Sequence, residues 1–223
     1  MDERTARQRV TATARMMETA GLAEAFGHVS SRWGDGFLIT STRPFATAGT
    51  DDLIRVDDSA APPPGGGEVP LETPMHAAVY LARPDVGAVC RAHPPAVVAW
   101  GTNNTDLPLL HGLGALAGVT VRVHADIDLI TTLEQAAAIA ASLGADSALI
   151  LRANGCLAVG ATPLEALTRL YYLEERAQVA LAGTASPTPY PDWGPRLTHT
   201  TGELSRAMAW VEAAFATPPE RPR

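Results

Sequence analysis

The chain has 223 residues, 46% of them hydrophobic, so it can bury a full core, and we expect a single domain over residues 1–223. Its net charge of -7 and its lack of a basic run argue against a nucleic-acid partner. All 17 basic residues are arginines, which excludes a lysine Schiff base, a lysine-anchored pyridoxal phosphate and a P-loop lysine.

The first third of the chain predicts one helix and two short strands. Residues 5–20 carry apolar side chains at helical spacing, and Gly21 is expected to end that helix. Residues 37–40 and 52–56 are predicted to be strands. The proline and glycine run at 60–67 is expected to be a surface loop.

Three later helices are predicted from their N-terminal signals. Thr73 places a hydroxyl before a proline at the first helical position and predicts a helix at 74–82. Thr131-x-x-Glu134 and Thr162-x-x-Glu165 match the capping box, in which a side chain and a backbone amide satisfy each other reciprocally. They predict helices at 132–143 and 163–183.

Apolar, β-branched runs between these helices predict buried strands at 87–91, 119–123 and 148–151. A sheet covered by helices follows. Residues 185–223 are expected to form a C-terminal extension, in which the proline-rich stretch 187–195 precedes a last helix at 202–215.

Neither the cysteines nor the hydropathy pattern indicates export. Cys90 and Cys156 form no Cys-x-x-Cys motif, so a disulfide framework is not expected. The N-terminus carries early acidic residues and no apolar segment of signal-peptide length. The apolar stretch 109–119 is shorter than the ~20 residues that span a bilayer. We therefore expect a soluble cytoplasmic protein with no membrane partner.

Two polar side chains end the strand predicted at 87–91. Residues two apart on a strand point to the same side, so Arg91 and His93 are expected to share one space, where Pro94 and Pro95 end the strand. Upstream, Glu72 stands just before the helix that begins with Thr-Pro. Together with the later segment Arg152-Ala153-Asn154-Gly155, these motifs resemble those of the class II aldolase/adducin family.

The resemblance covers about residues 5–183 and implies a fold. Alternating strands and helices would by themselves favour a parallel sheet. The family instead implies an α/β fold, a three-layer αβα domain with a mostly antiparallel central sheet. It also implies a homo-oligomer, usually a tetramer with pockets at subunit boundaries.

Catalytic members of this family hold zinc with three histidines, and this sequence departs from that set. Arg91 and Asn154 stand where two of the histidines are expected, and only His93 remains. A guanidinium has no lone pair and repels a cation, and an asparagine carbonyl suits calcium better than zinc. We therefore expect no zinc or other cofactor. The alternative is a rearranged site for zinc or another divalent metal that uses Glu72, His93 and a third ligand.

At the positions of the family's motifs we expect catalytic roles for Glu72, Arg91, His93 and Asn154, although Arg91 and Asn154 replace the family's residues. Glu72 is expected to move a proton, Arg91 and His93 to bind and polarise the substrate, and Asn154 to orient an oxygen. Plainer interpretations stay open: Glu72 as a solvated residue near a helix start, Arg91 as its buried ion-pair partner, His93 as a polar strand end, and Asn154-Gly155 as a type I′ hairpin turn.

The substrate is predicted from the family's phosphate-binding positions. Members acting on sugar phosphates have Gly-Asn, a hydroxyl-rich turn and Ser-Ser before the glutamate. Here those places read Gly27-His28, 40–43 and Pro70-Leu71, which disfavours a sugar phosphate. Residues 26–32 are more similar to the branch of aromatic and hydroxy-acid decarboxylases, and arginines favour a carboxylate. The substrate-binding candidates are His28, Ser30, Arg32, Thr40, Ser41, Arg43 and Tyr171, whereas His76 is expected to pack or to support the site.

The leading hypothesis is a divergent carbon–carbon lyase, an aldolase or decarboxylase that forms an enolate from a small carboxylated, non-phosphorylated substrate. The first alternative is a metal-dependent aldolase or decarboxylase with the rearranged metal site. The second is a non-catalytic, adducin-like assembly domain. The sequence does not choose between aldol cleavage, decarboxylation and another enolate reaction.

Overall fold

A seven-stranded sheet in the order β3-β2-β1-β4-β7-β6-β5 organises the protein. The computed structural model describes residues 2–57, 59–61, 65, 67–103, 105–183 and 197–216. The strands are β1 His28–Trp33, β2 Gly36–Ile39, β3 Ile54–Val56, β4 Ala88–Ala92, β5 Arg122–His124, β6 Ala148–Leu151 and β7 Cys156–Gly160. Within the described part of the chain only the β5–β6 pair is parallel, so the predicted mostly antiparallel sheet is confirmed.

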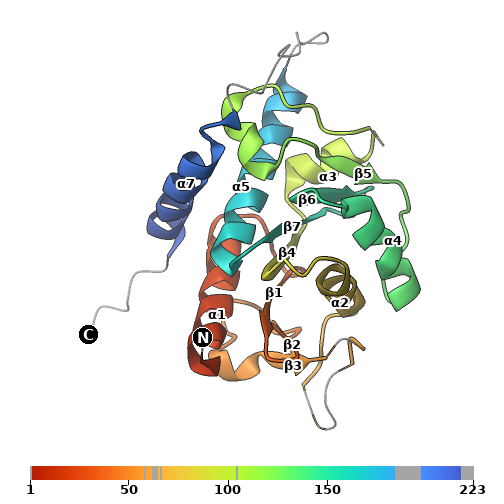
Figure 1. Cartoon of the computed structure of the whole chain (residues 1–223), viewed down its shortest axis with the longest axis vertical. Coiled ribbons are helices and arrows are strands. Elements are labelled where there is room, and N and C mark those ends of the chain that lie inside the picture. Colours follow the sequence, from red (N-terminus) through yellow and green to blue (C-terminus); the bar gives the residue numbers. More distant parts are fainter. Residues whose placement is uncertain are drawn as a thin grey trace.

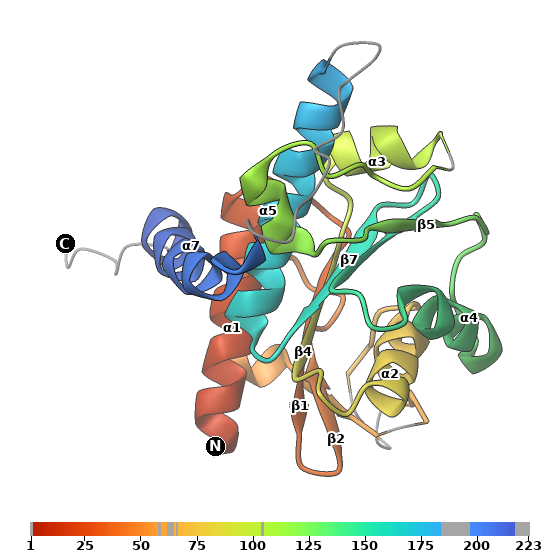
Figure 2. The same ribbon diagram turned by 45° about the horizontal axis from the view of Figure 1, so that its top comes forward.

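The helices cover both faces of this sheet, as the two views in Figures 1 and 2 show. They are α1 Glu3–Thr19, α2 Thr73–Ala82, α3 Pro95–Gly101, α4 Leu133–Leu143, α5 Pro163–Ala182 and α7 Thr200–Phe215, with short 3-10 turns η1 Thr50–Asp52 and η2 Gly112–Ala117. One hydrophobic core lies between the sheet and helices α1 and α5, and a second lies between the sheet and helices α2 and α4. The three-layer arrangement follows from these two cores.

Strand β4 contributes to both cores because its side chains alternate between the faces. Cys90 belongs to the core under α1 and α5, whereas Val89 belongs to the core under α2 and α4. Arg91 lies directly opposite His28 of β1 in the antiparallel register. Opposed residues share a face, so Arg91 and His28 both lie on the side that α2 covers. The register therefore brings two polar side chains to the start of α2.

Local signals placed several helix ends correctly. Asp2 caps α1, and Gly21 adopts a positive φ of 69° just after it, which favours glycine. Thr162 caps α5 by accepting a hydrogen bond from the Glu165 amide at 3.2 Å. Two cap predictions were wrong by one residue. Thr132, not Thr131, caps α4 and forms its box with Gln135. Helix α2 begins at Thr73 itself, whose hydroxyl donates to the Pro70 carbonyl oxygen.

Several elements differ from the sequence predictions. Strands β1 and β7 and helix α3 were not predicted, and residues 50–52 form a 3-10 turn, which takes the first position of the strand expected at 52–56. The strand expected at 119–123 begins only at Arg122. A hairpin does join β6 to β7, but its turn is centred on Arg152 and Ala153, because the Asn154 amide donates to the Leu151 carbonyl oxygen. Asn154-Gly155 is therefore not the centre of a type I′ turn.

The last helix, α7, packs against α5 through aromatic contacts of Trp210 and Phe215 with Tyr171. The proline-rich stretch 187–195 and residues 62–64 and 66 of the loop at 60–67 lie outside the described residues. Both cysteines are buried and free. Among the described residues no helix is long and apolar enough to cross a membrane.

Candidate functional site

A cavity of about 520 Å³ opens where the N-terminus of α2, the end of β4 and the β6–β7 loop meet. Its polar lining includes Glu72, His28, His93 and Asn154, and its walls are largely apolar. The lining residues are Glu24, Ala25, Phe26, Gly27, His28, Ser41, Thr42, Arg43, Pro44, Phe45, Glu68, Pro70, Leu71, Glu72, His93, Leu129 and Asn154. Three of the four predicted catalytic residues therefore line one space.

The Glu72 carboxylate is held asymmetrically. Arg91 Nη2 lies 3.1 Å and His28 Nε2 lies 3.6 Å from the same oxygen, Oε2. Among the described residues, the other oxygen, Oε1, contacts only the Asn154 side-chain amide, at 3.5 Å, the limit of a hydrogen bond. Oε2 is therefore the anchored oxygen, and Oε1 is the oxygen with free acceptor capacity beside the cavity.

The surroundings keep Glu72 ionised. Burial by itself raises the pKa of Glu72, but the His28 ring and the charge of Arg91 outweigh burial and lower the pKa to about 2. Arg91 is the permanent charge in this set, because a guanidinium does not lose its proton in proteins. Near neutral pH the site thus presents an ionised carboxylate.

Behind Glu72, four side chains form a continuous row of polar contacts, which we call the polar row: His28, His76, Ser30 and Tyr80. His28 Nδ1 lies 2.6 Å from His76 Nε2, and His76 Nδ1 lies 2.6 Å from Ser30 Oγ. Ser30 Oγ lies 2.7 Å from the Tyr80 hydroxyl. All four residues are buried. Burial lowers the pKa of His28 and of His76, so both imidazoles are neutral near pH 7.

His93 lies just past the end of β4, at the edge of the cavity. Its Nδ1 is 3.1 Å from the Phe26 carbonyl oxygen. A carbonyl only accepts, so Nδ1 carries the hydrogen in the neutral ring and Nε2 keeps a lone pair. Burial and the charge of Arg91 lower the pKa of His93. His93 is therefore a second proton acceptor at the cavity.

Gly155 lets the β6–β7 loop approach β4 closely. It has a φ of 77°, and a Cβ atom there would lie 2.2 Å from the Ala92 carbonyl oxygen and 2.8 Å from Arg91 Nη1. A side chain would push the loop away from β4. Gly155 thus allows the preceding Asn154 to reach Glu72.

Arg91 reaches Glu72 but not the cavity. Its side chain is 0% exposed, it is absent from the cavity lining, and its Nη1 donates to the Ala92 carbonyl oxygen at 2.7 Å. Arg91 Nε and Nη2 have no hydrogen-bond partner in the described part of the chain, so the ion pair with Glu72 is their main compensation. This geometry matches the interpretation of Arg91 as a buried ion-pair partner, and direct contact with a substrate would require Glu72 to move.

The donor set at this place does not suit zinc. Arg91 offers no lone pair and would repel a cation held beside it. The described residues contain no group of three or more histidine, cysteine, aspartate or glutamate side chains arranged to hold a metal ion. His28 is directed to Glu72 through Nε2 and to His76 through Nδ1, so both of its nitrogens are already engaged. We derive no chemical step through a metal.

The predicted substrate-binding residues divide into two groups. His28, Ser41 and Arg43 line the cavity, and Arg43 is 62% exposed while it pairs with Asp52 at 2.6 Å. Thr40 and Ser30 are buried outside it: the Thr40 hydroxyl accepts from the Val29 amide, and Ser30 belongs to the polar row.

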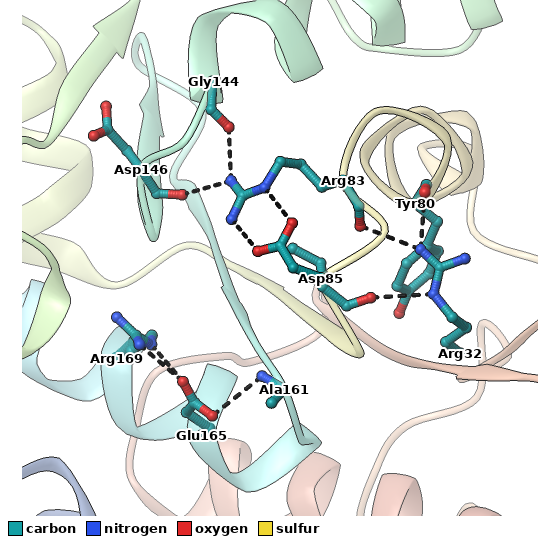
Figure 3. A network of polar contacts seen from close by, with 10 residues as sticks. Arg32, Tyr80, Arg83, Asp85, Gly144, Asp146, Ala161, Glu165 and Arg169 are labelled. Atoms are coloured by element: carbon teal, nitrogen blue, oxygen red, sulfur yellow. Dashed lines mark hydrogen bonds and ion pairs between the residues drawn. The ribbon is translucent and has the colours of Figure 1, made fainter. Parts of the chain in front are cut away.

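Arg32 and Tyr171 lie away from the cavity. Figure 3 shows the Arg32 guanidinium next to Tyr80 and Arg83, where it donates to the carbonyl oxygens of Tyr80, Arg83 and Val86. The same view shows Arg83 joining Asp85 to the backbone of Gly144 and Asp146, far along the chain. Arg32 therefore belongs to a network that fastens the end of α2. Tyr171 packs against α7.

Sequence reasoning missed the functional grouping of His76 and Tyr80. They stand four residues apart on α2 and so share a helix face, whereas His28 and Ser30 stand two apart on β1 and share a strand face. Those two spacings were visible in the sequence. They could not be combined, because β1 was not predicted as a strand.

Comparisons with known proteins match most of the chain. Residues 8–181 match the family model described as the Class II Aldolase and Adducin N-terminal domain. A 3,4-dihydroxyphthalate decarboxylase of Terrabacter sp. (strain DBF63) is 30% identical over 215 residues, 85% of this chain and 90% of that enzyme. The L-fuculose phosphate aldolase of Escherichia coli K12 is 29% identical over 167 residues, 74% and 77% of the two chains.

A solved structure supports the fold. The L-fuculose 1-phosphate aldolase from Glaciozyma antarctica PI12 superposes with a TM-score of 0.76 over 96% of this chain and 92% of that chain, at 22% identity. The α/β fold expected from the motifs is thereby confirmed. The matched relatives include both a decarboxylase and an aldolase, so the overall similarity does not identify the reaction.

Proposed function

Because this chain belongs to the class II aldolase and adducin family, we propose that it is a carbon–carbon lyase that decarboxylates a small, non-phosphorylated, hydroxylated aromatic acid. One observation carries the proposal. An ionised Glu72, paired through Oε2 with the buried Arg91, lines the same cavity as His93 and Asn154, and its Oε1 contacts only Asn154, at 3.5 Å, among the described residues. Glu72 and His93 are two acceptors that can take a proton from a substrate and return it to carbon.

The cavity walls support the substrate class. Phe26, Phe45, Leu71 and Leu129 give apolar surface against which an aromatic ring can pack. The side chains of Pro70 and Leu71 cannot donate hydrogen bonds to a phosphate. Three carboxylates, those of Glu24, Glu68 and Glu72, also line the cavity and disfavour a dianionic group.

Arg43 is the residue we assign to the substrate carboxylate. It is the arginine that lines the cavity among the described residues, and most of its side chain is exposed. Its partner Asp52 lies outside the cavity lining, so the Arg43 side chain can exchange that exposed ion pair for a substrate carboxylate at little cost. A guanidinium binds a carboxylate with two parallel hydrogen bonds.

The reaction then needs only proton transfers within the site. Glu72 Oε1 accepts the proton of a ring hydroxyl, and the electron pair moves into the ring. The proton is delivered to the ring carbon that bears the carboxylate, and the carbon–carbon bond breaks as carbon dioxide leaves with restoration of the aromatic ring. His93 Nε2 and the Asn154 amide hold the substrate oxygens in place. A proton from solvent then protonates the phenolate oxygen of the product, which balances the reaction.

Arg91 supports this reaction through Glu72. Together with the His28 ring, its fixed charge lowers the pKa of Glu72 against the opposing effect of burial. In this proposal the guanidinium stabilises the negative charge of the site from behind, and the reaction proceeds without a divalent ion.

The test is carbon dioxide release from a panel of hydroxylated aromatic acids, 3,4-dihydroxyphthalate included, after dialysis against a chelator. We expect turnover of at least one aromatic acid, no response to added zinc, and no cleavage of L-fuculose 1-phosphate. The Glu72→Gln variant is the matched control and should be inactive. Cleavage of the sugar phosphate, or activity that appears only with metal, would contradict the proposal.

A further inference from the structure

The polar row behind Glu72 has a single favourable direction of hydrogen bonding. A neutral imidazole carries one donor and one acceptor nitrogen, so its two neighbours decide which nitrogen holds the hydrogen. An ionised carboxylate can only accept. His28 Nε2, the nitrogen that faces Glu72 Oε2, is therefore the donor nitrogen.

The rest of the direction follows from the distances. With its hydrogen on Nε2, His28 accepts at Nδ1, so His76 Nε2 donates to it across 2.6 Å. His76 then accepts at Nδ1 from the Ser30 hydroxyl, also at 2.6 Å. Ser30 in turn accepts from the Tyr80 hydroxyl at 2.7 Å. Every member of the polar row is satisfied and every donor points toward Glu72.

The opposite direction is unfavourable. It would place a His28 lone pair against the Glu72 carboxylate, so that two acceptors face each other in a buried site and neither is satisfied by the other. The polar row also cannot serve as a path for protons to solvent. It ends at Tyr80, which is buried, and burial raises the pKa of that phenol.

We propose that the Glu72 carboxylate and the row of His76, Ser30 and Tyr80 together fix the tautomer of His28. His28 then directs its Nε2 hydrogen to Oε2 of Glu72, 3.6 Å away, and is a positioning residue that leaves Oε1 as the reactive oxygen. Arg91 and His28 both face Oε2, Arg91 Nη2 at 3.1 Å and His28 Nε2 at 3.6 Å. Arg91 contributes a permanent positive charge, whereas His28 contributes an N–H group that faces Oε2. The His76 side chain acts on the reaction only through His28, since it does not line the cavity.

The tautomer of His28 is independent of which reaction the enzyme performs, whereas the kinetic consequence rests on the proposed decarboxylation. The experiment therefore has two parts. The first is nitrogen NMR of the histidine rings in the ligand-free protein at pH 7. We expect both His28 and His76 to be neutral with the hydrogen on Nε2. A His28 ring with its hydrogen on Nδ1, or a charged ring, would overturn the proposal whatever the substrate is.

The second part compares His76→Leu with His76→Gln. Leucine removes the donor to His28, whereas the glutamine amide can replace it. With the substrate found in the panel, we expect His76→Leu to lower kcat by about 10- to 100-fold, the range for hydrogen-bond partners one step behind a reacting group, with KM changed less than about 2-fold. His76→Gln should recover most of the loss. Equal kcat values for wild type and His76→Leu would overturn the positioning role.

His124→Leu is the matched control, because His124 forms a similar part-buried contact with Ser142, at 2.8 Å, outside the site. It should leave kcat unchanged. If His76→Leu does not fold, Ser30→Ala provides the second variant, since it removes the donor to His76 Nδ1 and keeps the two rings. Ser30→Ala should shift the His28 signals toward a mixture of tautomers. Unchanged signals would contradict the proposal that the polar row fixes the tautomer of His28.

Discussion

The two largest fully buried side chains, Arg91 and Arg176, are both guanidiniums, and they are satisfied in opposite ways. Arg176 of α5 donates to carbonyl oxygens of the segment 107–119, among them Pro108 at 3.0 Å and Gly118 at 2.7 Å, and also Leu107. Arg91 has one carbonyl oxygen, that of Ala92, and the Glu72 carboxylate.

In the proposed mechanism this difference separates a structural cation, Arg176, from a functional one, Arg91. The backbone dipoles around Arg176 satisfy its donors and tie a long loop to α5, although burial lowers its pKa to about 10. In the part of the chain that the structure describes, Arg91 Nε and Nη2 form no hydrogen bond, and the Arg91 charge is directed to one oxygen of the Glu72 carboxylate. Buried polar groups with unused capacity are uncommon, and this one lies directly behind the cavity.

The largest expected effect is on the carboxylate that Arg91 serves. Glu72→Gln keeps the shape of the side chain but removes the proton acceptor, so kcat for the decarboxylation should fall by about 10²- to 10⁴-fold. Steady-state kinetics at a temperature where the variant is folded would measure the loss. A variant that keeps more than a tenth of kcat would remove Glu72 from the reaction.

Arg91→Met should cost the most stability, about 3–5 kcal/mol of unfolding free energy, because it leaves the buried Glu72 charge without its partner. Urea unfolding measures this cost. The double variant Arg91→Met with Glu72→Gln should regain most of the stability and none of the activity. Additive losses in the two single variants would mean that the two residues do not form a coupled pair.

Acid should reveal the same pair in the unmodified protein. The Glu72 pKa is about 2 when folded and 4.5 in its ordinary state, so the folded value is depressed. The stability that the ionised Glu72 provides is fully present above pH 4.5 and is lost as the pH falls toward 2, an amount of about 3 kcal/mol. Urea unfolding across this range should lose that part of its pH dependence in Glu72→Gln. An identical pH dependence in the variant would contradict the depressed pKa.

Arg176→Met tests the other side of the comparison. It removes the shared donor of several carbonyl oxygens and should lower the unfolding free energy by about 2–3 kcal/mol. Because Arg176 is remote from the cavity, kcat below the melting temperature should stay within about 2-fold of wild type. A loss of kcat comparable to that of Arg91→Met would erase the distinction between the two arginines.

The smallest effect is expected at Tyr171, which the sequence proposes as a substrate contact. The structure packs its ring between Tyr172 and α7, away from the cavity. Tyr171→Phe keeps those ring contacts, so kcat and KM should change less than about 2-fold, and stability by less than about 1 kcal/mol. A clear increase in KM would return Tyr171 to the substrate site.

Local sequence signals determined much of the fold. The glycine after α1, the Thr162 cap and the apolar run at 148–151 act within a few residues, so their outcome does not depend on the rest of the chain. Motifs of the same short range also placed Glu72 at the start of α2 and His93 at the end of β4. The family follows from those motifs, and with it the mostly antiparallel sheet.

Only the tertiary structure decided what each polar group touches. Strand alternation gave the face of Arg91 but not its depth, and depth is what directs Arg91 to Glu72 and away from the cavity. The polar row needs the β1–β4 register and the packing of α2 on that face, which join residues 46 to 50 positions apart in the chain. Contacts at such separations depend on the positions of whole strands and helices, which periodicities of two or four residues do not encode.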